Sequence, residues 1–317
     1  MLKKIILCAV MLAAAAVLTF GGISAVPVVN TDTGVELPIL MYHSVLKDSE
    51  LSGKYIVTPE LLEQDIEYLE KNGYTSVSMR SVTDYVDNGT PLPEKPVMLT
   101  FDDGCYNNYE YVLPILEKLN AHGIFCVGGK YTDHYTSINE ANTAYGYMRW
   151  IEVHNMSVNP HAELANHSYD FHRYGRGRNG SKKRANESGA EYKELFRADT
   201  QRVQNGFIKN SIDAPVIYAY PFGAYSKESF DVLKSMGFRA TLTCNEGINI
   251  ITRSPESLYL LKRNNRPSGI SSEQFLGKLL NESVKTGHIK SYAPFTAIYT
   301  FMRLPLLYLR LRQAFYF

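Results

Sequence analysis

Short apolar runs that alternate with longer segments of helical character constrain the fold of this chain most. Five such runs follow one another after residue 37: Pro38–Tyr42, Val97–Phe101, Gly123–Val127, Val216–Tyr220 and Arg239–Thr243. Most of them are nearly continuous in apolar residues, which is typical of strands buried on both faces of a parallel sheet. The pattern predicts repeated β-α units of an α/β protein, arranged either as a barrel or as an open doubly wound sheet.

The segments between these runs carry helix signals. Residues Pro59–Glu70 place apolar side chains at helical spacing, and Pro59 suits a first helical turn. Further helices are expected over Tyr109–Leu119 and Ser226–Met236, each leading through a glycine to the next strand. The succession shows no internal repeat, and we expect one catalytic domain over residues 30–285.

The N-terminus predicts export. Two lysines precede an uncharged stretch from Ile5 to Val29. Ser24 and Ala25 offer small residues for cleavage, whereas a stretch of this length is also enough to span a hydrocarbon core of roughly 30 Å. Residues 1–29 therefore form either a signal peptide or a signal anchor. Both place the catalytic part outside the cytoplasm, secreted or anchored to the outer face of the cytoplasmic membrane.

The C-terminal residues and the overall charge bear on partners. Residues 286–317 form an apolar, aromatic-rich tail with interspersed arginines. Such a tail either docks on the domain or lies in a membrane interface, so membrane association through either end of the chain is one option. The formal net charge of +1 offers no global attraction to nucleic acid, and no such partner is expected. Beyond the predicted signal segment, which contains Cys8, the cysteines are Cys105, Cys126 and Cys244. Their number is odd, so at least one thiol is free or pairs with another molecule.

Two adjacent carboxylates end one of the predicted strands. Asp102 and Asp103 follow the Val97–Phe101 run and precede Gly104. Adjacent residues on an extended chain point in opposite directions, so the pair divides into two roles, one carboxylate to bind a metal and one to accept a proton. A turn and helix start is the alternative, since Asp caps helices and Gly favours turns.

A histidine pair follows another predicted strand end. His167 and His172 come directly after Ala162–Ala165. Five positions put two side chains on different faces of a regular helix, so a loop or irregular turn has to bring them together. Two imidazoles and one carboxylate form the ligand set of many catalytic zinc sites. Together with Asp103, the two histidines are therefore candidate metal ligands.

A third strand end and one aromatic residue complete the candidate site. Tyr220, Pro221, Phe222 and Gly223 combine a constrained proline with a permissive glycine. Such a turn could place a backbone N–H and an aromatic wall beside a metal, with an ordinary strand-to-helix turn as the alternative. Trp150, the only tryptophan, is either part of a sugar-binding wall or a buried aromatic anchor.

In this order, the three segments resemble the motifs of polysaccharide deacetylases with a NodB-homology domain, over roughly residues 37–272. The resemblance implies a distorted (β/α) barrel of about seven strands and a divalent metal, Zn²⁺ first, with Co²⁺, Ni²⁺ or Mn²⁺ as others. It implies removal of N-acetyl groups from an acetylated glycan of the cell surface or wall, an N-acetylglucosamine polymer or peptidoglycan. Asp103, His167 and His172 then hold the metal. Asp102 is the base that takes a proton from water.

The sequence departs from the commonest family pattern in three places. The two histidines are separated by five residues rather than four, which resembles the branch of poly-N-acetylglucosamine deacetylases of biofilms. Ala219 stands where the family often has an arginine, so the orientation of Asp102 has to come from elsewhere. No late Leu-His motif supplies the general acid, and His43, at the end of the first predicted strand, is the candidate. The oxyanion is expected to meet the backbone N–H of Phe222.

The sequence allows two interpretations each for residues 173–191 and for Arg263, and three alternative functions for the chain. Residues 173–191, rich in glycine and basic side chains, are expected to be a solvated flexible loop, with contact to an anionic polymer as the alternative. Arg263 is expected to form a surface salt bridge, with orientation of an acidic residue at the site as the alternative. The same chemistry would serve an O-acetyl esterase or a small-molecule amidase. A non-catalytic glycan-binding protein is the third alternative.

Overall fold

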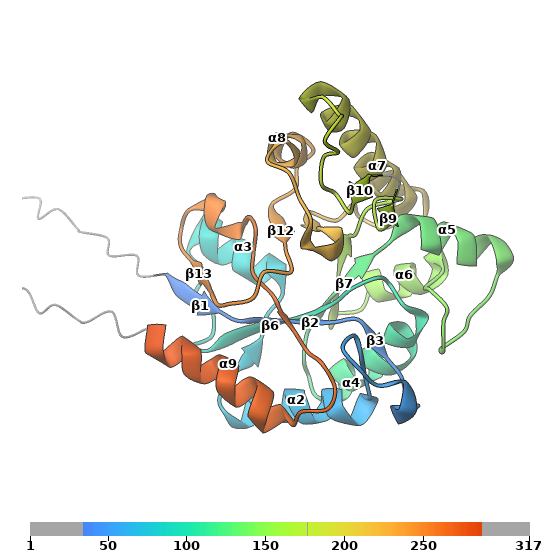
Figure 1. Ribbon diagram of the computed structural model, residues 1–317. Coiled ribbons are helices and arrows are strands. Elements are labelled where there is room, and N and C mark those ends of the chain that lie inside the picture. The colour runs from blue at the N-terminus through green and yellow to red at the C-terminus, as the bar shows by residue number, and fades with distance from the viewer. Residues whose placement is uncertain (1–33, 176, 287–317) are drawn as a thin grey trace, which may run out of the picture. The chain divides into compact units, whose positions relative to one another are not determined.

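A curled sheet of parallel strands lies at the centre of the computed structural model, which describes residues 34–175 and 177–286 (Figure 1). Its strands are β2 (Ile39–Tyr42), β5 (Thr75–Ser76), β6 (Pro96–Phe101), β7 (Gly123–Val127), β8 (Ala162–Asn166), β11 (Ile217–Ala219), β12 (Ala240–Leu242) and β14 (Asn264–Asn265). Seven of them run in the order β12, β11, β8, β7, β6, β2 and β14, and β5 also pairs with β6. All of these pairs are parallel. The expected distorted barrel is confirmed.

The segment that leads into β14 joins the two edges of this sheet. Leu261 forms a parallel bridge with Leu242 of β12, and Asn264 pairs with Leu40 of β2. Arg263 lies between these two pairings. The closing segment therefore carries this residue into the interior of the barrel.

Helices follow most of the strands. They are α2 (Pro59–Lys71), α3 (Met79–Asn88), α4 (Leu113–Lys118), α5 (Gly129–Ile138), α6 (Trp150–Ser157), α7 (Gly189–Lys209), α8 (Glu228–Ser235) and α9 (Ser272–Thr286). In α2, Thr58 accepts the amide N–H of Leu61 as an N-cap, and Pro59 occupies the first turn as predicted. The helix expected over Tyr109–Leu119 begins instead with one π-helical turn, Asn108–Val112, and continues as α4.

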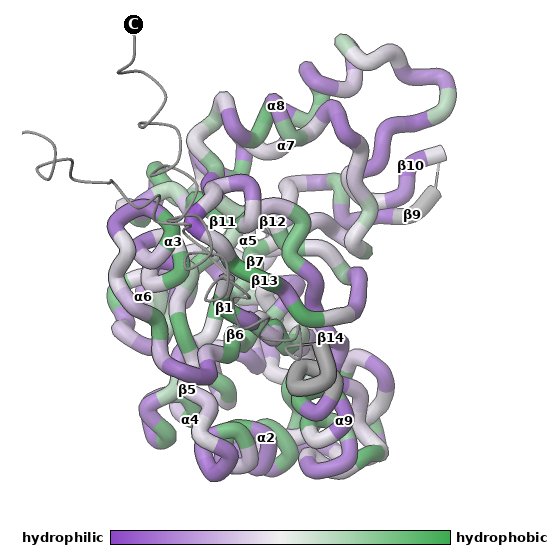
Figure 2. The backbone as a smooth tube through the Cα atoms, turned by 90° about the vertical axis from the view of Figure 1, so that its left-hand side faces the viewer, coloured by the Kyte–Doolittle hydropathy of each residue, from purple (hydrophilic) through white to green (hydrophobic). Residues whose placement is uncertain are grey.

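The core lies between the strands and these helices. Figure 2 shows β6 and β7 as mainly hydrophobic, whereas α2 and α9 alternate between hydrophobic and hydrophilic residues. The rings of Tyr42, Phe101 and Phe125 stack across three neighbouring strands, with centroids 5.2 and 5.0 Å apart. Tyr42 and Phe101 are the last residues of β2 and β6, so the stack lies next to the residues that carry the sequence motifs.

Short pairings and single helical turns complete the described fold. The antiparallel pairs are β1 (Val35–Leu37) with β13 (Asn249–Ile251) and β9 (Tyr174–Gly175) with β10 (Arg178–Asn179), and the parallel pair is β3 (Ser44–Val45) with β4 (Ile56–Val57). The 3₁₀ turns are Ser49–Leu51, Pro221–Gly223 and Pro255–Leu258. Within the described ranges, no helix combines the length and apolar character needed to cross a membrane. The predicted signal segment, residues 1–29, and residues 287–317 of the predicted tail lie outside these ranges.

The basic segment that follows His172 differs from expectation. The prediction of a solvated flexible loop over residues 173–191 is wrong for the parts that form the β9–β10 hairpin and the start of α7, whereas residues 180–188 between them form turns and irregular structure. Arg178 is only 3% exposed and forms an ion pair of 2.6 Å with Glu187. A buried guanidinium needs such a partner. Composition alone did not predict the ion pair between Arg178 and Glu187, because the chain has to turn back on itself to bring the two side chains together.

Candidate metal and catalytic site

Three strand ends meet at one edge of the barrel and bring the sequence motifs together. β2 pairs with β6 so that Tyr42 lies opposite Phe101, and the amide of Asp102 donates to the Tyr42 carbonyl at 2.9 Å. His43 and Asp102 therefore leave their strands at the same level. Asn166, the last residue of β8, pairs with residues of both β7 and β11. The candidate site lies at the carboxyl ends of the strands, where barrel enzymes bind their substrates.

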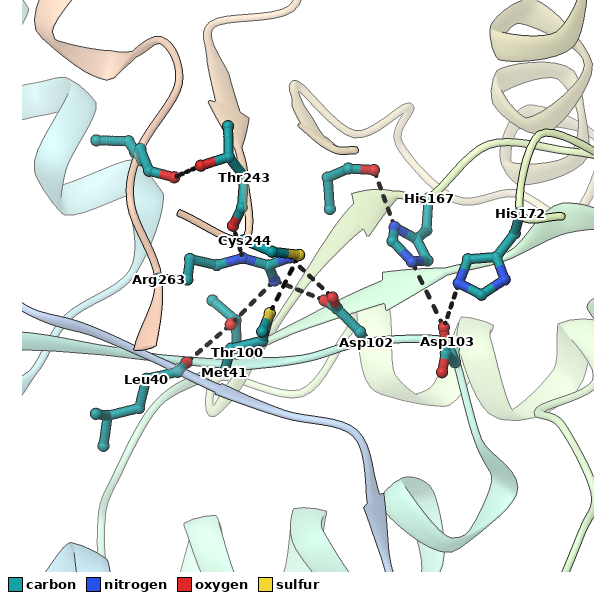
Figure 3. Close-up of polar contacts among 12 residues, drawn as sticks. Leu40, Met41, Thr100, Asp102, Asp103, His167, His172, Thr243, Cys244 and Arg263 are labelled. Carbon is teal, nitrogen blue, oxygen red and sulfur yellow. Dashed lines mark hydrogen bonds and ion pairs between the residues drawn. The ribbon is translucent and has the colours of Figure 1, made fainter. Parts of the chain in front are cut away.

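Asp103 faces two imidazoles (Figure 3). Its Oδ1 atom lies 3.0 Å from His172 Nε2 and 3.5 Å from His167 Nε2. The φ angle of Asp103 is 72°, so the chain turns sharply after β6 and the two aspartates separate. Each of the three residues offers one ligand atom, and these atoms lie within 4.8 Å of one another. The structure therefore brings together the three residues predicted as metal ligands.

The five-residue spacing is accommodated by a loop rather than a helix. Ser168, directly after His167, has a φ of 67°, which interrupts any helical course. The first turn of α5 fixes the loop from one side, because the amides of Gly129 and Lys130 donate to the carbonyls of Ser168 and Tyr169 at 3.0 and 3.2 Å. The ring centroids of the two histidines consequently lie 5.0 Å apart.

The donor set fits a divalent metal ion. Burial alone would raise the pKa of Asp103, but hydrogen bonds to His167 and His172 and their charges hold it well below its usual range. His167 Nδ1 lies 2.9 Å from the Ala219 carbonyl oxygen, a contact that leaves Nε2 facing Asp103. One carboxylate oxygen and two imidazole nitrogens are ligands that zinc prefers in open catalytic sites. These residues could therefore hold such an ion.

Asp102 is held on its other side by Arg263 (Figure 3). Two guanidinium nitrogens donate to the two carboxylate oxygens at 2.6 and 2.8 Å. Arg263 is 0% and Asp102 2% exposed. The guanidinium also donates to the Thr243 carbonyl at 2.8 Å. Burial alone would raise the pKa of Asp102, but the charge of Arg263 holds it well below its usual range, so this carboxylate is ionised at neutral pH.

Arg263 corrects one expectation and answers an open question. The surface salt bridge expected at this residue is wrong, and the alternative, orientation of an acidic residue at the site, is confirmed. Arg263 contacts both oxygens of Asp102 and so orients this carboxylate, which the short apolar side chain of Ala219 cannot do. The only sequence signal was the position of Arg263 in a basic segment near the end of the β/α succession. Its partner is 161 positions away in the chain.

His43 lies half-buried near the two aspartates. Its Nδ1 atom is buried and has no hydrogen-bond partner among the described residues. Burial lowers the pKa of His43, while the charges of Asp102 and Asp103 oppose this shift. The imidazole ring lies 4.7 Å from the ring of Tyr55, centroid to centroid. The position is compatible with a role toward substrate, and the assignment of His43 as the general acid stays a prediction.

The turn after β11 places an aromatic ring against His172. The ring centroids of Phe222 and His172 are 4.4 Å apart, and Phe222 has a φ of 58°, which non-glycine residues rarely adopt. Gly223 is required next, because a Cβ there would lie 2.6 Å from the amide nitrogen of Cys244. Phe222 therefore contributes to the wall of the site. The oxyanion role of its backbone N–H stays a prediction.

The other residues of the predicted wall are buried. Tyr220 is 0% exposed, and its hydroxyl lies 2.8 Å from the hydroxyl of Ser229. Pro221 is likewise buried. Their carbonyls close the Phe222 turn by accepting the amides of Gly223 and Ala224 at 2.8 and 3.0 Å, and their contact with substrate stays a prediction.

Trp150 is a buried anchor rather than an exposed sugar-binding wall. It is 6% exposed, its Nε1 donates to Asp133 at 2.8 Å, and its ring meets Phe207 edge-on. Of the two interpretations of Trp150, these contacts favour the buried aromatic anchor over the sugar-binding wall. The three cysteines of the described chain are all free, in agreement with the expectation of at least one unpaired thiol.

Comparisons with known proteins find similarity to polysaccharide deacetylases. A family model described as polysaccharide deacetylase matches residues 89–241. The poly-beta-1,6-N-acetyl-D-glucosamine N-deacetylase of Escherichia coli (strain K12) is 25% identical over 232 residues, which cover 66% of this chain and 34% of that protein. This chain thus matches about a third of the length of that relative.

Two solved structures share the fold. The deacetylase PplD of Streptococcus pyogenes, solved in complex with acetate, has a TM-score of 0.60 at 20% identity, covering 78% of this chain and 99% of that one. A de-N-acetylase from Aggregatibacter actinomycetemcomitans has a TM-score of 0.65 at 24% identity, covering 77% and 99%.

Proposed function

We propose that this chain, which matches the polysaccharide deacetylase family model over residues 89–241, removes N-acetyl groups from an extracytoplasmic polysaccharide with the help of a divalent metal ion. The observation that carries the proposal is the pair of adjacent aspartates in two different environments. Asp103 faces two histidines, and Asp102 is held by a buried arginine. Poly-N-acetylglucosamine is the first candidate substrate, as the name of the Escherichia coli relative suggests, and peptidoglycan is the second.

The metal would be held by Asp103, His167 and His172. Zn²⁺ is the first candidate for this donor set, with Co²⁺, Ni²⁺ or Mn²⁺ as others. When bound, such an ion supplies Lewis-acid chemistry to the acetamide and makes water more acidic. The contact between His167 Nδ1 and the Ala219 carbonyl orients the imidazole for this task.

Asp102 would act as the general base. Arg263 occupies both of its oxygens and prevents the carboxylate from turning toward the metal ligands. Because the pKa of Asp102 is held low, the carboxylate is ionised before substrate arrives. A low pKa also makes it a weak base, so proton transfer to Asp102 would depend on the metal making the water more acidic. The arrangement keeps proton transfer and metal binding on two separate carboxylates.

His43 would act as the general acid for the departing sugar amine. Its Nδ1 atom is buried without a partner among the described residues, and burial lowers the pKa of His43, although the charges of both aspartates partly oppose this shift. A lowered pKa makes the protonated imidazole a stronger acid, which can donate its proton when the carbon–nitrogen bond breaks. Acetate and a free amine are the products.

The proposal is tested by acetate release from poly-N-acetylglucosamine and from peptidoglycan, using metal-loaded full-length protein. Wild type should release acetate from at least one of them, and a chelator should abolish the activity until Zn²⁺ is restored. His43→Ala should lower kcat by about 100-fold or more. Full activity of His43→Ala would overturn the assignment of the acid.

O-acetylated xylan serves as the contrasting substrate. Acetate release from xylan alone would replace the proposal by an O-acetyl esterase. Wild type that binds Zn²⁺ and glycan but releases no acetate at any metal loading would indicate a glycan-binding protein instead.

A further inference from the structure

A carboxylate outside the sequence motifs holds the loop between the two histidines. Asp199 lies on α7, and its two oxygens accept the backbone N–H groups of Tyr169 at 2.8 Å and Asp170 at 2.7 Å. These two amides lie midway between His167 and His172. Asp199 therefore contacts the loop at its centre.

The loop needs such an acceptor because its spacing is not helical. In an α-helix, each amide would donate to a carbonyl four residues earlier. Here the left-handed Ser168 breaks that pattern, and the amides of the next two residues turn toward α7 instead. A backbone N–H removed from water without an acceptor is costly, so the carboxylate stabilises this particular course of the chain.

α7 also fixes the start of the loop. The side-chain amide of Asn166 donates to the Thr200 carbonyl at 3.1 Å, and its oxygen accepts the amide of Ser168 at 2.9 Å. Thr200 directly follows Asp199, so one turn of α7 holds both the beginning and the middle of the loop. On the other side, the first turn of α5 donates to the loop carbonyls. The two histidines are thus carried by a segment fixed between two helices.

We propose that Asp199 is a positioning residue of the metal site, which sets the separation of His167 and His172 and thereby the affinity for the metal. The inference rests on the proposed function, because it requires that the two histidines bind the ion. Groups that orient metal ligands indirectly typically change metal affinity by about 10- to 100-fold when they are removed. The effect of Asp199 is expected in that range.

Glu163 provides a matched control. It lies on β8, the strand that leads to His167, and its carboxylate accepts the backbone N–H of Met79 at 2.6 Å. It is four positions before His167, near the start of the strand, and supports the start of α3. Glu163→Gln therefore weakens the same kind of bond as Asp199→Asn, from a backbone amide to a carboxylate, at a place that does not hold the histidine loop.

The experiment measures Zn²⁺ affinity of the full-length protein by competition with a chelating dye, for wild type, Asp199→Ala, Asp199→Asn and Glu163→Gln. Asp199→Ala should lose about 10- to 100-fold in affinity, and Asp199→Asn, which keeps one acceptor oxygen, should lose less. Glu163→Gln should bind within about twofold of wild type. Thermal unfolding of the metal-free proteins shows whether the variants lose similar stability.

Hydrogen exchange gives a second readout that does not depend on metal. The amides of Tyr169 and Asp170 should exchange faster in metal-free Asp199→Asn than in wild type, and at wild-type rates in Glu163→Gln. If Asp199→Ala does not fold, Asp199→Asn carries the test alone.

Unchanged Zn²⁺ affinity in the folded Asp199 variants would overturn the inference and leave the proposed function intact. Equal losses of affinity in Asp199→Asn and Glu163→Gln would also overturn it, because general destabilisation would then explain both. If wild type and His172→Ala bind Zn²⁺ equally, the proposed function itself fails.

Discussion

The two sides of the site, one around Asp102 and one around Asp103, are built in different ways. Asp102 lies inside the barrel, where Arg263 from the closing segment occupies both of its oxygens. Asp103 is half-buried at the rim and faces histidines carried by a loop. One peptide bond separates the two carboxylates, yet strands position the first and loops position the second.

The difference shows how neighbouring groups can acquire different chemistry. On the inner side, burial and a fixed cation leave Asp102 little freedom, which suits a base that must stay ionised and aligned. On the outer side, Asp103, His167 and His172 would hold a metal ion through three ligands and leave further positions for water and substrate. Stability on the inner side comes from the barrel itself. On the outer side it depends on supports from α5, α7 and the Phe222 turn.

The sharpest test of this comparison exchanges the two aspartates separately for asparagine. Asp102→Asn should lower kcat/KM by about 10²- to 10⁴-fold, the range of general acid–base catalysis, with Zn²⁺ affinity close to wild type. Asp103→Asn should lose activity together with Zn²⁺ affinity. Deacetylation kinetics and Zn²⁺ titration measure the two effects. Comparable loss of Zn²⁺ binding in both variants would show that the carboxylates share one role.

Removal of Arg263 tests the inner side. Arg263→Met leaves Asp102 as an unpaired buried charge, and should lower the free energy of unfolding by about 3 to 5 kcal/mol. Arg266→Met is the control, because Arg266 forms a similar buried pair with Asp65, at 2.8 and 3.0 Å, outside the site.

Chemical denaturation of both variants gives the stabilities, and kinetics separate their roles. Both should be destabilised, whereas kcat should fall further in Arg263→Met than in Arg266→Met. If kcat falls equally in the two variants, Arg263 has only a structural role.

The outer side should show its own pH dependence through Asp199. Burial raises the pKa of Asp199 to about 6, above the ordinary aspartate value, although the amides of Tyr169 and Asp170 oppose this. The folded protein therefore binds this proton more tightly than the unfolded chain does. The resulting stability is fully present below about pH 4 and is lost as the pH rises through about 6.

Between pH 4 and pH 7, the free energy of unfolding of metal-free wild type should thus fall by at most about 3 kcal/mol more than that of Asp199→Asn. This is an upper limit because Asp199 retains some contact with solvent. Denaturation curves of both proteins across this range provide the measurement. If the free energies of unfolding of the two proteins differ by the same amount at every pH in this range, the raised pKa of Asp199 is contradicted.

The smallest effect concerns the hairpin that supports the Phe222 turn. A Cβ at Gly180 would lie 2.4 Å from the Pro221 carbonyl oxygen, whereas a Cβ at Gly177 would meet no atom within 4 Å. Both glycines have positive φ angles. Gly180→Ala should therefore lower the free energy of unfolding by at least about 1 kcal/mol more than Gly177→Ala, as thermal unfolding would show. Equal losses would mean that the hairpin does not support the turn.

Local patterns predicted the inner framework well. The buried strands and α2 carry strong periodicity and end signals, and these elements appear within a few residues of their expected bounds. The grouping of Asp103, His167 and His172 was also predictable, since motifs at the ends of parallel strands meet at one edge. The buried ion pair of Arg178 with Glu187 and the burial of Arg263 against Asp102 were not, because a local pattern does not show which residue each arginine meets.

By itself, the sequence determined a succession of β/α units and three motif segments that resemble those of polysaccharide deacetylases, because strand patterns and motif residues are local properties of the chain. Only the tertiary structure decided how the five-residue histidine loop closes and which group holds Asp102. Asp199 meets its loop amides from about 30 positions away, and Arg263 meets Asp102 from 161. Contacts of that kind form when the barrel closes and α7 packs against it, and no local pattern specifies them.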